Sequence, residues 1–337
     1  MQQQTIDFTS SATTLYFDAS FKILKELAPT EHSFIITDEN LMFHYQDEFK
    51  PWKVITIPAG EESKSLNILD DIIRQLIALE AGRDAIIIGI GGGVVTDIAG
   101  FVAGIYKRGV RCGFVPTSIL AMVDAAIGGK NGLDIGEYKN MMGLIKQPEF
   151  LLCDYSLLKS LPQEEWINGF AEIIKHACIC DAEMFALLER YDIKDFQKDR
   201  ALLHTLISRN TLLKAGVVQA DEWETGERKK LNFGHTLAHA IENVYQLPHG
   251  HAVSIGMAFA ANLSKEFLRF DQAKRITDLL EKYKLPVSFP YDRKQALNNM
   301  LVDKKREQDS ISYILLSEIG KAITHPIAID EIRKILN

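Results

Sequence analysis

The sequence has no excess of positive charge. Its 38 Lys and Arg are outnumbered by 45 Asp and Glu, which gives a formal net charge of -7. Proteins that bind DNA or RNA normally gather Lys and Arg on one face. We therefore expect no nucleic-acid partner, whereas a small anionic substrate is compatible if positive charge is concentrated locally.

Long hydrophobic runs are also missing. No stretch reaches the roughly 18 apolar residues that a membrane-spanning helix requires, and residues 1–17 lack the basic and then apolar segments of a secretion signal. We expect a cytoplasmic protein with no membrane partner. Cysteine is scarce and lacks zinc-ribbon spacing, which favours reduced core thiols. The four cysteines are Cys112, Cys153, Cys178 and Cys180.

The first half of the chain alternates short apolar runs with segments of helical periodicity. Residues 66–79 have apolar positions at helical spacing, and the apolar runs have the length of buried strands. The predicted strands are 33–37, 54–57, 85–89, 113–115 and 150–153. This alternation predicts an α/β, Rossmann-like domain with a mostly parallel sheet over residues 1–160.

After Leu161-Pro162 the pattern changes to long amphipathic segments. Residues 164–189, 201–220 and 236–245 have helical periodicity, which predicts a mainly α-helical domain over residues 161–337. Gly320 lies between two apolar runs, 312–316 and 322–324, which predicts a small hairpin inside that domain.

A glycine-rich turn follows the third predicted strand. Residues 88–97 read IGIGGGVVTD, and a helical pattern begins at Val94. Glycines at a helix N-terminus allow a phosphate to approach the backbone amides, as in dinucleotide-binding folds. The spacing is not the usual G-x-G-x-x-G, so a simple tight turn remains an alternative.

A second glycine segment carries charge. Asp124 and Lys130 flank two glycines, and Lys139-Asn140 follows in what we expect to be a Gly-rich loop. Lysine on such a loop suits a phosphate monoester, because the ammonium is a point charge and backbone amides complete the site. A solvated surface loop is the alternative.

The C-terminal half contains two helical patterns of metal-ligand residues. Glu172, Lys175 and His176 share one helical face, and His235, His239 and Glu242 repeat the pattern. His249 and His251 follow. A catalytic zinc ion normally takes three protein ligands, so these residues exceed what one site needs, and spacing alone does not select the set.

Taken together, these motifs resemble those of 3-dehydroquinate synthases in order and spacing, from about Thr37 to Gly320. The motifs that carry the resemblance are 91–97 (GGGVVTD), 116–118 (PTS), 124–130 (DAAIGGK), 139–140 (KN), 169–172 (GFAE), 231–236 (LNFGHT), 249–251 (HGH) and 303–305 (DKK). Ala126-Ile127 and Ser118 depart from the residues that many relatives have, without removing a charged group.

The resemblance implies a zinc- or cobalt-dependent and NAD-dependent enzyme. It gives Glu172, His235 and His251 as metal ligands and makes His239 a substrate-side hydrogen-bonding or proton-transfer group. The implied NAD contacts are Asp38, Glu61, Lys64, Gly92, Gly93, Asp97, Thr117, Ser118 and Lys139.

The resemblance also implies residues that bind the substrate and carry the chemistry. Glu224 matches a proposed proton acceptor, and Arg108 matches an arginine that reaches a neighbouring subunit's phosphate site, which predicts a homodimer. The other implied positions are Asp124, Lys130, Asn140, Lys175, Lys214, Arg228, Asn232 and one or both of Lys304 and Lys305.

The activity implied is conversion of 3-deoxy-D-arabino-heptulosonate 7-phosphate to 3-dehydroquinate and phosphate, in the shikimate pathway. A related sugar-phosphate cyclase acting on a substrate without a carboxylate is an alternative, which Lys214 and Arg228 oppose because they match carboxylate-binding positions. A metal-dependent polyol dehydrogenase and a non-catalytic NAD-binding protein are two further alternatives.

Overall fold

The computed structural model describes residues 1–136, 138–302, 306–307 and 309–336. They group into two compact units. Unit 1 comprises residues 1–165 and 207–223, and unit 2 comprises residues 166–206 and 224–337. The sequence predicted a domain boundary at residue 160. The observed grouping differs from that prediction mainly in segment 207–223, which packs with unit 1.

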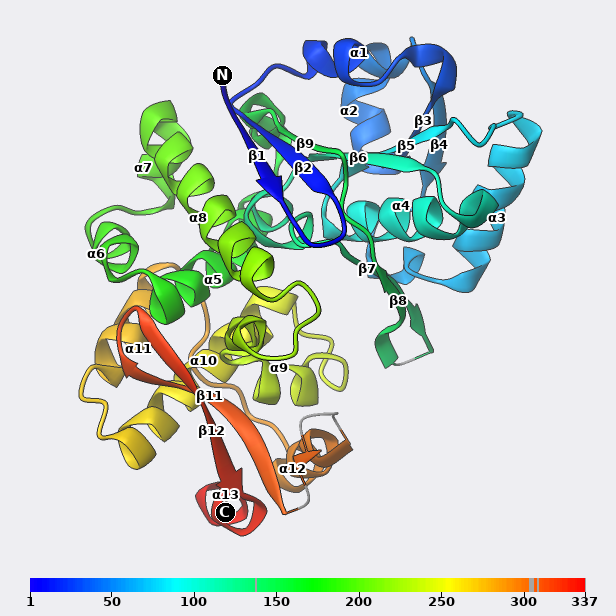
Figure 1. Ribbon diagram of the computed structural model, residues 1–337. Helices are drawn as coiled ribbons and strands as arrows, with labels where there is room; N and C mark the ends of the chain where they lie inside the picture. The colour runs from blue at the N-terminus through cyan, green and yellow to red at the C-terminus, as the bar shows by residue number, and fades with distance from the viewer. Residues whose placement is uncertain (137, 303–305, 308, 337) are drawn as a thin grey trace. The chain divides into compact units, whose positions relative to one another are not determined.

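Unit 1 contains a seven-stranded sheet with the order β1-β2-β9-β6-β5-β3-β4 (Figure 1). Only the β1–β2 pair is antiparallel; the other neighbours are parallel. The strands are β1 Gln2–Asp7, β2 Ala12–Phe17, β3 Ser33–Asp38, β4 Lys53–Ile57, β5 Ile86–Gly91, β6 Arg111–Pro116 and β9 Phe150–Cys153. The mostly parallel sheet is confirmed, and all five predicted strands are found.

Helices cover both faces of this sheet because its central strands are apolar on both sides. Ile86, Ile88 and Ile90 of β5 face one core cluster, which includes Leu24 and Leu41 from the first two helices. On the other face, Gly89 lies against Ala99 of α4: a Cβ on Gly89 would come within 2.8 Å of the Ala99 Cβ. The helices are α1 Leu24–Leu27, α2 Glu39–Phe49, α3 Leu66–Ala78 and α4 Gly93–Ile105.

The strand order contains a point where the chain reverses its direction of progress through the sheet. From β3 the chain adds β4 on one side and then β5 and β6 on the other. In open α/β sheets, ligands bind beyond the carboxyl ends of the strands at such a switch point. Here those ends are Asp38 of β3 and Gly91 of β5.

Residues 130–135 and 138–145 form a two-stranded antiparallel ribbon, where the sequence predicted a loop. The strands are β7 Lys130–Ile135 and β8 Tyr138–Ile145, and Lys130 pairs with Ile145. Gly132 permits the pairing, because a Cβ there would lie 2.8 Å from the carbonyl oxygen of Met142. Lys130, Lys139 and Asn140 are therefore held by strand register.

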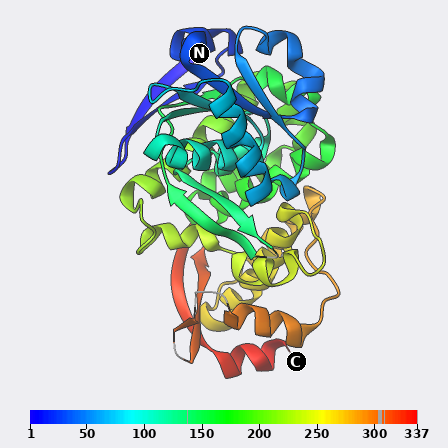
Figure 2. The same cartoon turned by 90° about the vertical axis from the view of Figure 1, so that its right-hand side faces the viewer.

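Unit 2 is mainly helical, as expected (Figure 2). Its helices, including two that run across the unit boundary, are α5 Gln163–Cys180, α6 Ala182–Arg190, α7 Ile193–Lys198, α8 Arg200–Ala220, α9 His235–Glu242, α10 His249–Leu268, α11 Ala273–Lys282, α12 Arg293–Val302 and α13 Ile329–Leu336. Asp181 separates α5 from α6, because its carboxylate caps the new helix at Met184 N. Among the described helices, none is long and apolar enough to cross a membrane.

A small sheet completes unit 2. Its strands are β10 Arg306–Glu307, β11 Ser310–Glu318 and β12 Lys321–Ala328. Gly320 adopts φ +88° in the β11–β12 turn, so the predicted hairpin is confirmed.

The sequence predicted that all four cysteines are core thiols, and the structure differs at Cys180. Cys112, Cys153 and Cys178 are buried, whereas Cys180 is exposed. Burial raises the pKa of Cys112 to about 12, which leaves this thiol protonated and unreactive. All four cysteines are free, but only three are core thiols.

Candidate active site

The glycine-rich turn lies at the carboxyl end of β5 and opens α4. Gly92 is the N-cap in an extended conformation, and Gly93 is the first helical residue. A Cβ on Gly93 would come within 3.1 Å of the Ala125 Cβ, and one on Gly92 would lie 3.6 Å from Ser118 Oγ. The turn is therefore closely packed, and the first amides of α4 lie at the sheet edge, where a helix N-terminus favours anions. Thr117 and Ser118, both buried, follow β6 at the same edge.

Asp38 ends β3, on the other side of the switch point. Its Oδ1 accepts a hydrogen bond from Leu41 N at 3.0 Å, so it also caps α2. Burial raises the pKa of Asp38, against the lowering effect of its backbone hydrogen bonds. The predicted cofactor residues of β3, β5 and β6 thus gather at the edge where α/β folds bind ligands.

A buried ammonium connects predicted cofactor residues with a predicted substrate residue. Lys64, 4% exposed, donates to Asp97 Oδ2 at 2.8 Å and to Asn140 Oδ1 at 2.6 Å. Burial lowers the pKa of Lys64, but Asp97 and Glu61 outweigh it, so the pKa is raised. Burial raises the pKa of Asp97 to about 6, although Lys64 opposes the shift. Lys139 Nζ lies 3.7 Å from Glu61 Oε1 and extends the network.

The segment before the ribbon is held by α8. Lys214 Nζ lies 2.7 Å from Asp124 Oδ1 and 2.6 Å from its carbonyl oxygen, which fixes both the side chain and the backbone of Asp124. Thr211 Oγ1 donates to the Met122 carbonyl at 2.9 Å. Lys130, exposed, begins β7 six residues later. Asp124, Lys130 and Lys214 are therefore parts of one local arrangement in unit 1.

Unit 2 contains a carboxylate between two imidazoles. One ligand atom each from Glu172 of α5, His235 of α9 and His249 of α10 lies within 4.8 Å of the others. Glu172 Oε1 is 3.6 Å from His235 Nε2 and 3.2 Å from His249 Nε2. Glu172 is fully buried and also pairs with Lys175, so cationic groups are stabilised around it. A carboxylate with two imidazole nitrogens is a donor set that suits zinc.

The two histidines differ in protonation. Burial and the nearby Lys175 charge lower the pKa of His235 well below its usual value, so this imidazole is neutral. Burial also opposes the charged form of His249, but hydrogen bonds to Glu172 and Glu242 prevail and raise its pKa to about 10. Glu242 Oε1 lies 3.5 Å from His249 Nδ1 and leaves Nε2 directed to Glu172.

His249, and not His251, joins Glu172 and His235 in this cluster. The two histidines stand at the start of α10, and helical positions two apart project about 200° from each other. Only one of them can therefore face Glu172. Among the described residues, His251 is in no group of three ligand atoms of this kind. The assignment of His251 as a ligand, which rested on the resemblance, is not supported by this geometry.

Other predicted residues lie near this cluster in sequence. The rings of His239 and His235 are 5.4 Å apart. Asn232 Nδ2 donates to Glu224 Oε1 at 2.9 Å, so two predicted substrate-side residues are in contact. Arg228, in the same connection, is only 2% exposed.

Arg108, unlike the buried Arg228, lies at the surface. It is exposed at the turn after α4, where both Lys107 and Arg108 have positive φ (48° and 72°), an unusual backbone for these residues. Lys304 and Lys305 lie outside the described residues.

Sequence reasoning overlooked two residues that support this region. Glu222 and Gln147 are buried and hydrogen-bonded to each other, Nε2 to Oε1, at 2.8 Å. Neither belongs to a motif with recognisable spacing, and a Glu among Asp221, Glu222 and Glu224 looks like part of a solvated acidic run. Nothing in the sequence distinguishes it from its neighbours.

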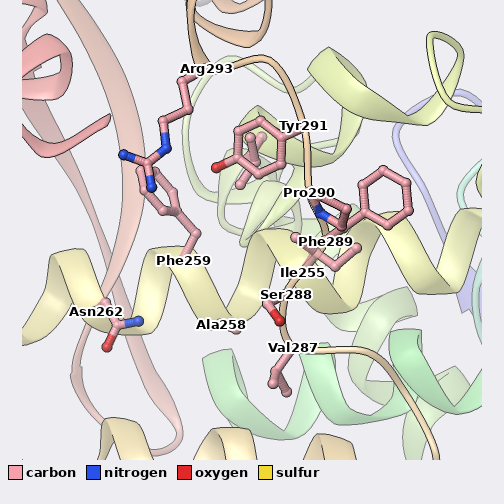
Figure 3. Close-up of a pocket in the computed structure, with 11 residues that line it drawn as sticks. Ile255, Ala258, Phe259, Asn262, Val287, Ser288, Phe289, Pro290, Tyr291 and Arg293 are labelled. Carbon is pink, nitrogen blue, oxygen red and sulfur yellow. The ribbon is translucent and has the colours of Figure 1, made fainter. Parts of the chain in front are cut away.

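A cavity of unit 2 lies away from the Glu172 cluster. It has a volume of about 640 Å³ and lies between α9, α10 and the segment before α12. Figure 3 shows that aromatic and apolar side chains dominate its wall, with Asn262 and Arg293 near the edge. None of the metal-ligand candidates of unit 2 lines it, so we place the chemistry at the Glu172 cluster.

Comparison with known proteins gives consistent matches along the chain. Residues 54–168 match the family model for the 3-dehydroquinate synthase N-terminal region, and residues 169–306 match that for the C-terminal region. The 3-dehydroquinate synthase of Leptospira interrogans is 40% identical over 301 residues, covering 86% of this chain and 83% of the relative. That of Pyrococcus abyssi is 42% identical over 269 residues, covering 79% of each chain.

Solved structures share the fold at lower identity. A 2-epi-5-epi-valiolone synthase from Streptomyces hygroscopicus, solved with NAD+ and Zn2+, superposes with a TM-score of 0.86 at 24% identity, covering 100% of this chain and 98% of that one. A 2-deoxy-scyllo-inosose synthase with NAD+ and Co2+ gives 0.83 at 24% identity, covering 99% of each chain. An iron-containing alcohol dehydrogenase gives 0.67 at 13% identity, covering 99% of this chain and 98% of that one. At such identities the structural likeness establishes the fold, while the matches to both family models and to relatives near 40% identity establish that the chain belongs to the 3-dehydroquinate synthase family.

Proposed function

We propose that this chain is a 3-dehydroquinate synthase, a phosphorus-oxygen lyase that converts 3-deoxy-D-arabino-heptulosonate 7-phosphate to 3-dehydroquinate and phosphate. The observation that carries the proposal is 40% identity to a curated enzyme of that name over more than four fifths of both chains. The product belongs to the shikimate route to chorismate and the aromatic amino acids, in the cytoplasm.

The metal site in this proposal consists of Glu172, His235 and His249. The carboxylate and the two imidazoles suit zinc or cobalt, and three protein ligands leave a position for substrate oxygens. A bound divalent ion supplies Lewis acidity toward the hydroxyl at carbon 5 and the ketone that replaces it. Glu242 orients His249 by accepting from Nδ1, and Lys175 holds the second oxygen of Glu172.

The same proposal places NAD at the sheet edge of unit 1. Gly92 and Gly93 stand at the N-terminus of α4, where free backbone amides and the helix dipole suit a pyrophosphate. Bound NAD supplies a reversible two-electron oxidation at carbon 5 and is restored within each turnover. Asp38, Asp97 and Thr117 bind and orient the cofactor. The other cofactor contacts in this proposal are Glu61, Lys64, Ser118 and Lys139.

The remaining steps use charged residues. Oxidation at carbon 5 acidifies the proton at carbon 6, which the substrate phosphate or Glu224 accepts as phosphate leaves carbon 7. Lys130 and Asn140, with Arg108 from a second subunit of a homodimer, stabilise the leaving dianion electrostatically. After reduction at carbon 5 the ring opens, and an internal aldol addition closes the carbocycle.

The carboxylate end of the substrate has its own residues in this proposal. Arg228 binds the carboxylate together with Lys214, and Lys304 or Lys305 contributes a further charge. Asn232 and His239 donate hydrogen bonds to hydroxyl groups, and Asp124 positions Lys214.

The test combines purified protein, NAD, zinc and the heptulosonate phosphate. We expect phosphate release with no accumulation of NADH. Stoichiometric NADH on a polyol, without phosphate release, would instead establish a polyol dehydrogenase. Turnover of a phosphorylated sugar without a carboxylate, in preference to the acid, would establish a different sugar-phosphate cyclase.

The metal assignment is tested by direct zinc measurement. His249→Ala should lose stoichiometric zinc, whereas His251→Ala should retain it, because only His249 faces Glu172. His239→Ala should keep the metal and slow catalysis. Loss of zinc in His251→Ala with retention in His249→Ala would reverse the assignment.

A further inference from the structure

The tip of the N-terminal hairpin is tied to a buried carboxylate. Ser10, in the β1–β2 turn, donates from its backbone N to Glu222 Oε2 at 2.9 Å and from Oγ to Oε1 at 2.6 Å. Gln147 Nε2 adds a third donor at 2.8 Å. Glu222 is 2% exposed; burial alone would raise its pKa, but these hydrogen bonds prevail and hold the pKa below its usual value. The carboxylate is therefore ionised and joins two segments far apart in sequence.

Gln147 connects this carboxylate to the residue before Lys130. A Cβ on Gly129 would lie 2.9 Å from Gln147 Cδ, so the glutamine side chain packs directly on the Gly129 backbone. Gly129 has φ +69°, and its carbonyl accepts from Lys146 N at 2.8 Å and from Asn131 Nδ2 at 2.6 Å. Movement of Gln147 would therefore be passed to Gly129 and to the start of β7.

The hairpin also packs on the middle of this segment. Residues of the hairpin and of segment 126–128 line a common void of only about 10 Å³, which means that the contact is nearly filled. The residues around this void include Phe8, Thr13 and Leu15 on one side and Ala126, Ile127 and Gly128 on the other. Lys214 and Thr211 of α8 fix the start of the same segment at Asp124 and Met122. Segment 122–130 is thus held at one end by α8 and at the other by the hairpin and Gln147.

We propose that Glu222 is a positioning residue which, by anchoring Ser10 and Gln147, uses the N-terminal hairpin to hold segment 124–130 in its substrate-binding geometry. The role of Lys130 as a phosphate ligand rests on the proposed function; the mechanical connection from Ser10 to Gly129 does not. Because Glu222 is buried and its oxygens bind Ser10 and Gln147, its effect should appear in substrate binding through Lys130 rather than in cofactor or metal binding.

The test compares two serines that each donate to an oxygen in unit 1. Ser10→Ala removes the Oγ bond to Glu222, and Ser33→Ala removes a 2.6 Å bond to the Pro29 carbonyl at the start of β3, four strands away from β2 in the sheet. We expect both to lower the melting temperature by a few degrees, since each loses about one hydrogen bond. Only Ser10→Ala should raise the KM for the heptulosonate phosphate and the inhibition constant of inorganic phosphate, each about 5- to 30-fold, with NAD and zinc affinity within twofold of the native protein.

Conservative variants separate positioning from folding. Ser10→Thr keeps a hydroxyl and should restore the native KM. Glu222→Gln should raise KM at least as much as Ser10→Ala; if Glu222→Gln does not fold, Ser10→Ala alone decides. Equal KM values for Ser10→Ala, Ser33→Ala and the native enzyme would overturn the proposal.

A second measurement does not depend on turnover. Hydrogen exchange of amides 122–131 should be at least about fivefold faster in Ser10→Ala than in Ser33→Ala, because loss of the Ser10–Glu222 hydrogen bond loosens that segment locally. Unchanged exchange would refute the positioning role of Glu222, whatever the measured KM values are. If the native protein releases no phosphate but exchange is faster in Ser10→Ala, the proposed function is refuted. The structural role of Glu222 in holding segment 124–130 is then still supported.

Discussion

Replacing Lys64 by Met should expose the energetic cost of the buried charge network in unit 1. The ammonium is 2.8 Å from Asp97 Oδ2 and 2.6 Å from Asn140 Oδ1, and the residue is 4% exposed. Methionine keeps the length of the side chain and removes the charge. Removing one partner of a buried ion pair typically costs about 3–5 kcal/mol, because the other charge stays buried without compensation. We expect a loss of that size in the free energy of unfolding at pH 8.

The loss should depend on pH in a defined direction. The pKa of Asp97 is about 6 in the native protein against 3.8 ordinarily, so the folded form binds more protons than the unfolded form between these values. Stability attributable to Asp97 therefore falls as pH rises through this window, by up to about 3 kcal/mol in total. Without Lys64 the pKa of Asp97 rises further. The deficit of Lys64→Met should consequently be largest at pH 8 and smaller at pH 5, where Asp97 takes up a proton.

Urea unfolding followed by circular dichroism at pH 5, 6.5 and 8 measures this dependence. The double variant Lys64→Met/Asp97→Asn removes the buried charge and should recover most of the loss at pH 8. Lys274→Met is the matched control: Lys274 is 84% exposed and pairs with Asp278 at 2.7 Å, a surface pair worth less than about 1 kcal/mol. A deficit that is independent of pH, or one that the double variant does not reduce, would refute the reasoning.

Three further predictions concern residues of unit 2, and the last of them is compared with a glycine of unit 1. Arg228→Ala should lower kcat/KM for the carboxylated substrate by about 30-fold to several thousand-fold, from roughly 2–5 kcal/mol, and should change little for an analogue without the carboxylate. Glu242→Gln should weaken zinc affinity by about 10- to 100-fold in a metal-competition titration, because His249 loses its orienting carboxylate; native affinity would show that Glu242 is dispensable. Gly256→Ala should lower the melting temperature and zinc content, because its Cβ would lie 1.9 Å from the Gly234 carbonyl oxygen beside His235, whereas Gly216→Ala, with nothing within 4 Å, should stabilise the protein by about 0.5–1 kcal/mol.

The parts of the fold that the sequence predicted well are those with one dominant signal. The strands at 33–38 and 86–91 are runs of apolar, β-branched residues buried on both faces, and no other structure accommodates them as well. The ribbon 130–145 was missed because its glycines indicated a loop, whereas Gly132 is there to let two strands approach. The hairpin 2–17 was missed because its first strand is polar and mostly exposed.

The sequence predicted which residue types form the metal site, but not which of the two histidine side chains of 249–251 faces Glu172. The resemblance gave Glu172, His235 and His251 as metal ligands, whereas the structure brings the first two together with His249. The choice between His249 and His251 depends on where α10 begins and which face it turns to α5. These are tertiary properties, and two histidines separated by one glycine carry no local signal for them.

The pairing of β2 with β9 has a consequence for the order in which the chain can fold. Phe17 pairs with Cys153, and Ser10 binds Glu222, so β2 is synthesised well before the strand and the carboxylate that hold this hairpin. At about 5–20 residues per second, the ribosome needs roughly 7 to 27 s to travel from residue 17 to residue 153. During that interval the nascent hairpin has no sheet to join. Its polar first strand, with Gln2, Gln3, Gln4 and Thr5 all exposed in the finished protein, keeps this waiting segment from offering an apolar edge to other chains.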